Sequence, residues 1–176
     1  MDEVSLTELS ALHAIYGVSN YVYEGTTLEE TREILACAGL VPHSVFCDIG
    51  AGYGAVVLYG AALCPCGFIA VEAVGRRAAH IARVARRLGL DRVRVVEADA
   101  DAVDLTRVTH VYLNNPFLGR TASAFPERLA RRATPGCRVI ALNNIVADFR
   151  RSGRYREIET EARLPSYRFG VFELGR

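Results

Sequence analysis

The sequence predicts an α/β domain built on a doubly wound sheet of seven strands, mostly parallel, with an antiparallel hairpin at its C-terminal end. Short apolar runs alternate with segments of helical periodicity along most of the chain, which is typical of parallel strands joined by crossover helices. The last two apolar segments are separated only by the turn Pro165-Ser166, which favours a hairpin. Ligands of such sheets bind at the carboxyl ends of the strands, where the strand order reverses.

Three helices and two strands are expected in the first half of the chain. Leucine and isoleucine recur at helical spacing between residues 4 and 15. A second helix begins at Thr26 or Thr27, either of which can cap it, has two glutamates in its first turn and ends before Gly39. The apolar pattern then predicts, in order, a strand at 45–48, a helix at 55–63 and a strand at 68–72.

The second half continues the alternation. The clearest helix spans residues 74–88, with one apolar face and one arginine-rich face. Strands are expected at 94–96, 110–113 and 137–142, and a helix at 121–133 that Pro135-Gly136 ends. Residues 143–154 are interpreted as a basic loop, 157–164 as an alternating strand and 167–174 as the last strand.

The composition is that of a globular protein with one domain of ordinary size. The 176 residues are 51% hydrophobic and 23% charged, and no apolar run is long enough to span a membrane. The acidic N-terminus argues against a signal peptide, and five cysteines without zinc-like spacing favour neither a disulfide framework nor a metal. We expect an intracellular protein without a metal, with an N-terminal helix and loop at 1–25 and a single domain at 26–176.

The charges are unusual in kind and in distribution. All 21 basic residues are arginine, and the net charge is only +1. Residues 1–48 are strongly acidic, whereas residues 120–156 contain nine arginines against two acids. A basic C-terminal half favours an acidic or polyanionic partner. Codon bias in a GC-rich genome explains the arginines equally well, and the absence of lysine is also compatible with avoidance of self-modification by a lysine-modifying enzyme.

A glycine-rich turn follows the first predicted strand of the sheet. Asp48 precedes Gly50, Gly52 and Gly54, and glycines allow a tight turn and a close approach of the backbone to a ligand. The spacing is not that of a dinucleotide-binding turn, and without a lysine there is no Walker motif. An acid directly before the first glycine resembles motif I of the S-adenosylmethionine (SAM)-dependent methyltransferases. A turn that serves packing alone is the alternative.

Carboxylates also end the next two predicted strands. Glu72 ends the second strand, where a carboxylate can accept hydrogen bonds from both hydroxyls of a ribose. Asp99 follows the third strand between two alanines, where it can accept from an adenine amine. Asp101 and Asp104 compete with Asp99 for that role.

The fourth strand ends in Asn114-Asn115-Pro116-Phe117. Carboxamide oxygens accept hydrogen bonds without carrying a charge. Asn114 can therefore orient an amine nucleophile beside a sulfonium centre. Asparagine is also common in turns, which is the structural alternative.

In the order and spacing of these segments the chain resembles the disruptor-of-telomeric-silencing histone lysine methyltransferases. The likeness covers residues 20–174. The matching stretches are Tyr23-Glu24-Gly25-Thr26-Thr27, with Gly and Glu exchanged relative to the family; Val45 to Gly54 with Val56-Val57-Leu58; Val71-Glu72; Val111 to Gly119, with Pro116 inserted; Gly136 to Leu142; and Phe149 to Arg154.

The resemblance implies a class I SAM-dependent methyltransferase with a Rossmann-like fold, whose substrate is a histone lysine on the globular face of the nucleosome. Glu24, Thr26 and Asp48 would then hold the methionine end of SAM, Glu72 the ribose and Asp99 the adenine. Asn114 would lie beside the methyl group, and Tyr167 with Phe172 would line a lysine channel. In this sequence Asn115 and Phe117 would also contact the substrate, and Arg150 and Arg154 would bind the acidic patch of the nucleosome. The resemblance leaves the general base open among Tyr21, Tyr23 and solvent.

Two other functions are compatible with the sequence. Asn114 to Phe117 is one residue away from the Asn-Pro-Pro-Phe motif of methyltransferases that modify a planar amine, in a nucleobase or a protein glutamine. Arginines at 74–88 and 150–156 would then bind phosphates. A SAM-binding module without catalysis is the other candidate. The protein would be nuclear if the substrate is a histone and otherwise cytoplasmic, and its oligomeric state is left open.

Overall fold

The computed structural model describes residues 25–117, 119–161, 164 and 167–175. The predicted helix at 4–15 lies outside the described residues, as does all of the proposed N-terminal segment except residue 25. Within the described part, no helix is long and apolar enough to cross a membrane.

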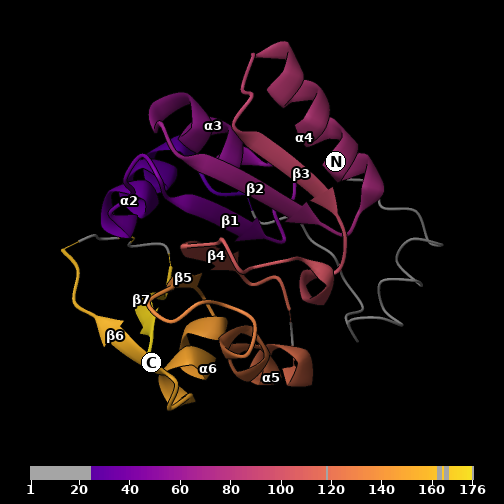
Figure 1. The fold of residues 1–176 in the computed structure, drawn as a ribbon. Coiled ribbons are helices and arrows are strands. Elements are labelled where there is room, and N and C mark those ends of the chain that lie inside the picture. Colours follow the sequence, from indigo (N-terminus) through magenta and orange to yellow (C-terminus); the bar gives the residue numbers. More distant parts are fainter. Residues whose placement is uncertain (1–24, 118, 162–163, 165–166, 176) are drawn as a thin grey trace.

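A seven-stranded sheet organises the fold, in the order β3-β2-β1-β4-β5-β7-β6. Strands β1 to β5 run parallel, whereas β7 runs antiparallel to both β5 and β6. The mostly parallel sheet with an antiparallel C-terminal hairpin is therefore confirmed (Figure 1). The strands are β1 (Val45–Ile49), β2 (Gly67–Glu72), β3 (Val93–Glu97), β4 (His110–Asn114), β5 (Arg138–Leu142), β6 (Tyr155–Ile158) and β7 (Phe169–Leu174).

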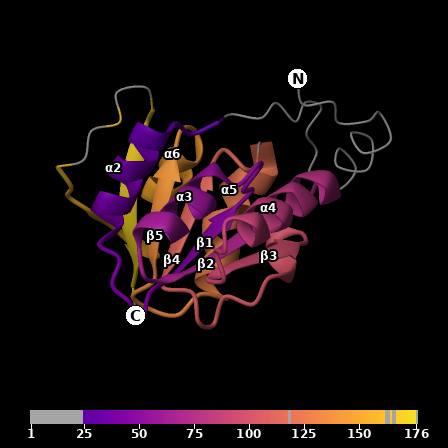
Figure 2. The same cartoon turned by 90° about the horizontal axis from the view of Figure 1, so that it is seen from above.

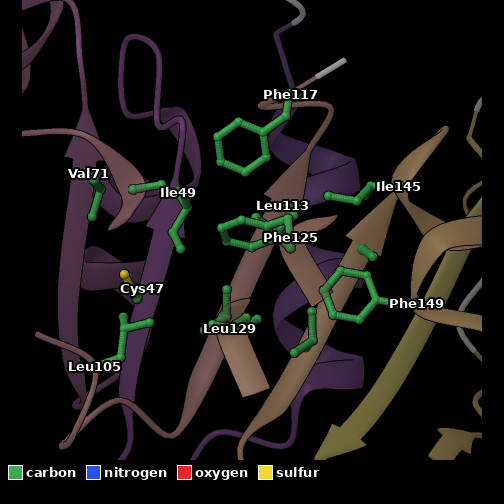
Figure 3. Packing of buried hydrophobic residues seen from close by; sticks show 14 of the residues in the cluster. Cys47, Ile49, Val71, Leu105, Leu113, Phe117, Phe125, Leu129, Ile145 and Phe149 are labelled. Atoms are coloured by element: carbon green, nitrogen blue, oxygen red, sulfur yellow. The ribbon is translucent and has the colours of Figure 1, made fainter. Parts of the chain in front are cut away.

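Helices cover both faces of the sheet, and each layer encloses an apolar core. Helices α2 (Leu28–Ala38), α3 (Ala55–Leu63) and α4 (Gly75–Arg87) lie on one face, and α5 (Gly119–Ala130) and α6 (Ile145–Arg151) on the other (Figures 1 and 2). A short 3-10 helix, η1 (Ala100–Ala102), follows β3. Figure 3 shows the core under α5 and α6, where aromatic rings pack between the helices and the sheet.

The first described helix begins and ends where its capping residues predict. The Thr27 hydroxyl accepts from the Glu30 N–H, and the Glu30 carboxylate accepts from the Thr27 N–H, which satisfies two backbone donors of the first turn. Gly39 takes the left-handed conformation at the other end. Of the two threonines that the sequence offered, Thr27 is the cap.

Two predictions near the C-terminus were wrong. The segment interpreted as a basic loop contains α6, because Ile145, Val146 and Phe149 lie on one side of a helical turn and are buried against the sheet. The strand expected at 157–164 is shorter and begins earlier, at Tyr155. In both segments arginines interrupt a short apolar pattern, so the buried positions could not be identified from the sequence alone.

We expect the contact between α3 and β2 to tolerate no side chain at Gly60. A Cβ atom there would lie 2.5 Å from the buried Phe68 ring, so Gly60→Ala should lower the melting temperature, although alanine favours helices. Thermal unfolding measures this effect. Gly153→Ala, where a Cβ would meet nothing within 4 Å, is the control, and a Gly60→Ala variant as stable as the parent contradicts the prediction.

Candidate functional site

The strand order reverses between β1 and β4, and the predicted site residues gather at the carboxyl ends of these strands. From β1 the chain continues to β2 on one side, whereas β4 continues to β5 on the other. Open α/β sheets bind their ligands in a crevice at such a point, so we expect the ligand crevice of this protein there.

The glycine turn after β1 forms one wall of this crevice. Gly50, Gly52 and Gly54 all have positive φ angles, of 83°, 57° and 78°, which other residues adopt only with strain. A Cβ on Gly50 would lie 2.9 Å from the Pro116 Cβ. The turn therefore packs directly against the loop that follows β4, and the two predicted motifs are brought together.

The Glu72 carboxylate anchors the glycine turn from the neighbouring strand. One oxygen accepts from the Gly52 N–H at 2.7 Å, and the other accepts from the Val74 N–H at 2.8 Å. The side chain is only 5% exposed, and this burial raises its pKa despite the backbone hydrogen bonds. Each carboxylate oxygen has a second lone-pair direction, so Glu72 can hold the turn and still accept from a ligand hydroxyl.

Asp48, at the end of β1, is a buried acid in an unfavourable environment. It is 3% exposed. Burial and the nearby Glu72 carboxylate together raise its pKa to about 8. Two desolvated carboxylates that repel each other form a site where a cationic ligand gains electrostatic energy.

Thr26 and Tyr167 lie on the same side of the crevice as Asp48. The Thr26 Oγ1 is 3.0 Å from the hydroxyl of the buried Tyr112, which is the register partner of Asp48 across β1 and β4. The Tyr167 hydroxyl is 3.3 Å from a Glu30 carboxylate oxygen and thus lies at the start of α2. Glu24, Tyr21 and Tyr23 lie outside the described residues.

The three aspartates after β3 differ in their hydrogen-bond partners. Asp101 pairs with Arg128 and Arg132, and Asp104 accepts from the hydroxyl and the N–H of Thr106. Asp99 caps η1, with one oxygen accepting from the Asp101 N–H at 2.7 Å. Its other oxygen makes no hydrogen bond within the described part of the chain, which favours Asp99 for contact with a ligand.

Asparagines at the ends of β4 and β5 are hydrogen-bonded to one another. Asn114 and Asn115 were predicted from the sequence as site residues, whereas Asn143 and Asn144 were not. The Asn143 Nδ2 donates to the Asn114 Oδ1 at 2.8 Å, and the Asn144 N–H donates to the Asn115 Oδ1 at 3.0 Å. Asn115 and Asn143 both have positive φ angles. The repeated Asn-Asn dipeptide after two neighbouring strands was the signal that could have identified Asn143.

The Asn114 amide also has a buried donor. Among the described residues, nothing accepts a hydrogen bond from its Nδ2. An unsatisfied buried donor is costly, and here it lies at the carboxyl end of a central strand. A ligand acceptor would remove that cost.

The two phenylalanines predicted to contact a substrate are core residues. Phe117 is 4% exposed and packs on Phe125, with ring centroids 4.6 Å apart (Figure 3). Phe172 is 1% exposed and stacks on Phe149 at 5.4 Å. The structure therefore assigns both rings to packing.

The arginines predicted to bind a partner are paired within the chain. Arg150 makes a forked contact with Glu157, with a shortest distance of 2.7 Å. The Arg154 Nε lies 3.5 Å from a Glu127 oxygen. These side chains link α5, α6 and β6, so they contribute to the structure whether or not they contact a partner.

A family model described as "Histone methylation protein DOT1" matches residues 3–111. The chain belongs to this family. The match includes Asp48, the glycine turn, Glu72 and Asp99 but ends before Asn114. The resemblance inferred from the sequence is thus confirmed over the part of the DOT1 domain that carries the proposed cofactor residues. A comparison with curated proteins gives no match.

Solved structures with the same fold include methyltransferases of diverse kinds. An RNA methyltransferase from Salinibacter ruber in complex with S-adenosyl-L-homocysteine has a TM-score of 0.67 at 19% identity, with 86% of this chain and 92% of that chain covered. TrmN from Thermus thermophilus has a TM-score of 0.67 at 20% identity, with 85% and 49% covered. A precorrin-6y C5,15-methyltransferase from Geobacter metallireducens has a TM-score of 0.65 at 17% identity, with 85% and 90% covered.

The chain is therefore a SAM-dependent methyltransferase of class I fold, and SAM is confirmed as the predicted cofactor. The described residues fit this cofactor. A buried acid with a raised pKa suits a cationic ligand, and a second buried carboxylate suits the hydroxyls of a ribose. The buried Asn114 donor, which has no acceptor among the described residues, can donate to a ligand.

We predict that Asp48→Asn stabilises the fold, increasingly so as the pH rises. The pKa of Asp48 is about 8 in the folded protein and 3.8 as its ordinary value. Between these values the folded state binds more protons than the unfolded state, so the Asp48 contribution lowers stability as pH rises, by up to about 1.4 kcal/mol per pH unit. A neutral amide in place of the carboxyl group removes this slope.

Thermal unfolding at pH 5, 6, 7 and 8 measures the effect. The difference in melting temperature between Asp48→Asn and the parent should grow across this series. Asp91→Asn, which removes an exposed carboxylate at a turn, is the matched control. A difference that stays constant from pH 5 to pH 8 would mean that Asp48 titrates normally.

Proposed function

We propose that the chain methylates the side-chain amine of a protein lysine, with a core histone on the globular face of the nucleosome as the substrate. The observation that carries this proposal is the DOT1 match over the segment that builds the Asp48–Glu72 crevice. Asn114 supports it, because a carboxamide at the end of β4 can orient an amine without charging it.

The chain's own residues would act mainly by positioning and by excluding water. SAM, when bound, supplies a methyl group on a sulfonium centre, and charge disperses as that methyl passes to a neutral amine. Ionised Asp48 would hold the cationic methionine end of SAM. Thr26, whose hydroxyl lies beside that of Tyr112, would contact the same end. Glu72 would accept from the ribose and Asp99 from the adenine. Burial of both central acids keeps water out and strengthens these contacts.

Asn143 is assigned a positioning role in this mechanism. Its Nδ2 occupies one acceptor direction of the Asn114 Oδ1 and so fixes the plane of the Asn114 amide. The second acceptor direction can receive an N–H of the substrate amine, which points the nitrogen lone pair away from Asn114. Tyr167 would border the amine entrance beside α2.

Methylation of a planar amine is the second candidate. The observation that favours it is the contact between Pro116 and Gly50, which places Asn114-Asn115-Pro116-Phe117 against the glycine turn. The Asn114 amide also offers a free donor next to its acceptor, which matches the paired acceptor and donor of an amide or a nucleobase edge.

Docking of Arg150 and Arg154 on the acidic patch of the nucleosome is kept as part of the proposal. Partner carboxylates would have to replace Glu157 and Glu127, their present partners. Exchange of one exposed ion pair for another costs little. The gain in binding free energy is also small, so these two arginines would determine the orientation of the enzyme on the nucleosome more than its affinity.

The substrate class is tested with tritiated SAM incubated in parallel with nucleosomes, free histones, DNA and RNA. Label on a histone lysine in the nucleosome sample is the expected result. Label confined to a nucleic acid would establish the second candidate instead. Glu72→Ala, which removes the proposed ribose acceptor, is the inactive control.

We predict that Asn143→Ala lowers kcat about tenfold while the affinity for S-adenosylhomocysteine changes by less than about threefold, because one orienting hydrogen bond is worth about 0.5–1.5 kcal/mol. Asn114→Ala should lower kcat further. Asn144→Ala is the matched control, because only its backbone N–H takes part in the pairing. Methyl transfer and calorimetry supply the two quantities, and a parallel loss in both would place Asn143 in cofactor binding.

A further inference from the structure

Two sets of arginines among the described residues differ in their partners. Between residues 128 and 156, seven arginines pair with carboxylates: Arg128, Arg132, Arg138, Arg150, Arg151, Arg154 and Arg156. In contrast, helix α4 contains arginines but no Asp or Glu. Within the described residues, no carboxylate lies at ion-pair distance from the exposed Arg83, Arg86 and Arg87.

Helical geometry gathers these α4 arginines on one outward face. Arg83 and Arg87 are four residues apart and Arg76 is seven residues before Arg83, so all three follow one line along the helix over about 16 Å. The buried face is the opposite one, with Ala78, Ile81 and Ala85 among its members. Figure 2 shows α4 along the outer side of the sheet, next to the edge strand β3.

Helix stabilisation explains only part of this pattern. Arg86 and Arg87 lie in the last turn of α4, where cations favour the helix dipole. Arg76 and Arg77 lie in its first turn, where cations are unfavourable. Arg77 is 5% exposed and its guanidinium lies over the Tyr53 ring, so packing accounts for it. The helix dipole does not account for the exposed Arg76 and Arg83.

One of these arginines is also held in place beside the site. The Arg83 guanidinium donates to the His80 Nδ1 at 3.0 Å, because an arginine can only donate. The His80 ring meets Tyr53 of the glycine turn edge-on, with centroids 5.3 Å apart. A polyanion on this face would therefore pass next to the crevice wall.

We infer that Arg83, Arg86 and Arg87 form a docking surface for the phosphate backbone of duplex nucleic acid. Several cations along the exposed side of a helix match a backbone that carries charge continuously along its length. Arginine suits phosphate because its planar fork binds two oxygens. The inference stands apart from the choice of methyl acceptor, since a nucleosome and a free nucleic acid both present such a backbone.

Fluorescence anisotropy with a labelled 30-base-pair DNA duplex, without SAM, tests this surface. The triple variant Arg83→Gln/Arg86→Gln/Arg87→Gln should bind at least about tenfold more weakly, and its slope of log affinity against log salt should be shallower by about 2 to 3. The control Arg150→Gln/Arg154→Gln/Arg156→Gln removes the same charge from paired arginines and should stay within about threefold of the parent.

Two further measurements separate the outcomes. The variant Arg83→Lys/Arg86→Lys/Arg87→Lys keeps the positive charge, so its affinity should have the same salt dependence as that of the parent. If the triple glutamine variant does not fold, the double variant Arg83→Gln/Arg87→Gln takes its place. Equal losses in the test and control variants would mean that net charge alone drives binding and would overturn the inference. Binding of the parent protein to polyglutamate but not to DNA would also overturn the inference. The affinity for S-adenosylhomocysteine should be the same in all variants.

Discussion

The Glu72 carboxylate is the contact on which the site depends. By accepting from Gly52 and Val74 it ties the glycine turn to the loop that begins α4. This can happen only because the carboxylate is buried between them, and the same burial brings it close to Asp48 and raises the pKa of both acids. The geometry that shapes the turn and the electrostatics that favour a cationic ligand thus have one cause.

The surrounding fold must supply the stability that this arrangement costs. Two separate apolar cores lie on the two faces of the sheet, and both reach the central strands that carry the acids. Cys47 and Ile49 point into one core, whereas Phe46, beside Asp48 on the same face, packs in the other. The strained and charged segment is therefore flanked by rigid packing, which is how folded proteins usually support a functional site.

Much of the fold could be predicted because its signals are local. Capping at Thr27, termination at Gly39 and the acid before the glycine turn each depend on neighbouring residues only. It was harder to predict which side chains turn into the core. Phe117 follows a functional motif yet turns into the core, and α6 was hidden by its arginines, because burial depends on contacts between distant segments.

The pairing of Asn114 with Asn143 shows the same limit. Each asparagine-containing turn looks ordinary by itself, and only the parallel register of β4 and β5 places the two amides 2.8 Å apart. The positive φ of Asn143 is tolerated more readily by asparagine than by most other residues. The strain and the hydrogen bond thus occur in one residue, which is typical of positions held for function rather than for folding.

The contacts of the arginines help to explain why this chain uses arginine and not lysine. The forked contact of Arg150 with Glu157 uses two nitrogens of one guanidinium, a geometry that a single ammonium cannot provide. At position 150 arginine therefore makes a contact that lysine cannot reproduce. On α4, where no carboxylate of the described chain meets Arg83, Arg86 or Arg87, charge alone would serve the fold, and the fork becomes useful only when an external group with two oxygens arrives. Codon bias accounts for the overall number of arginines but not for the contrast between the seven that pair with carboxylates and the exposed set on α4.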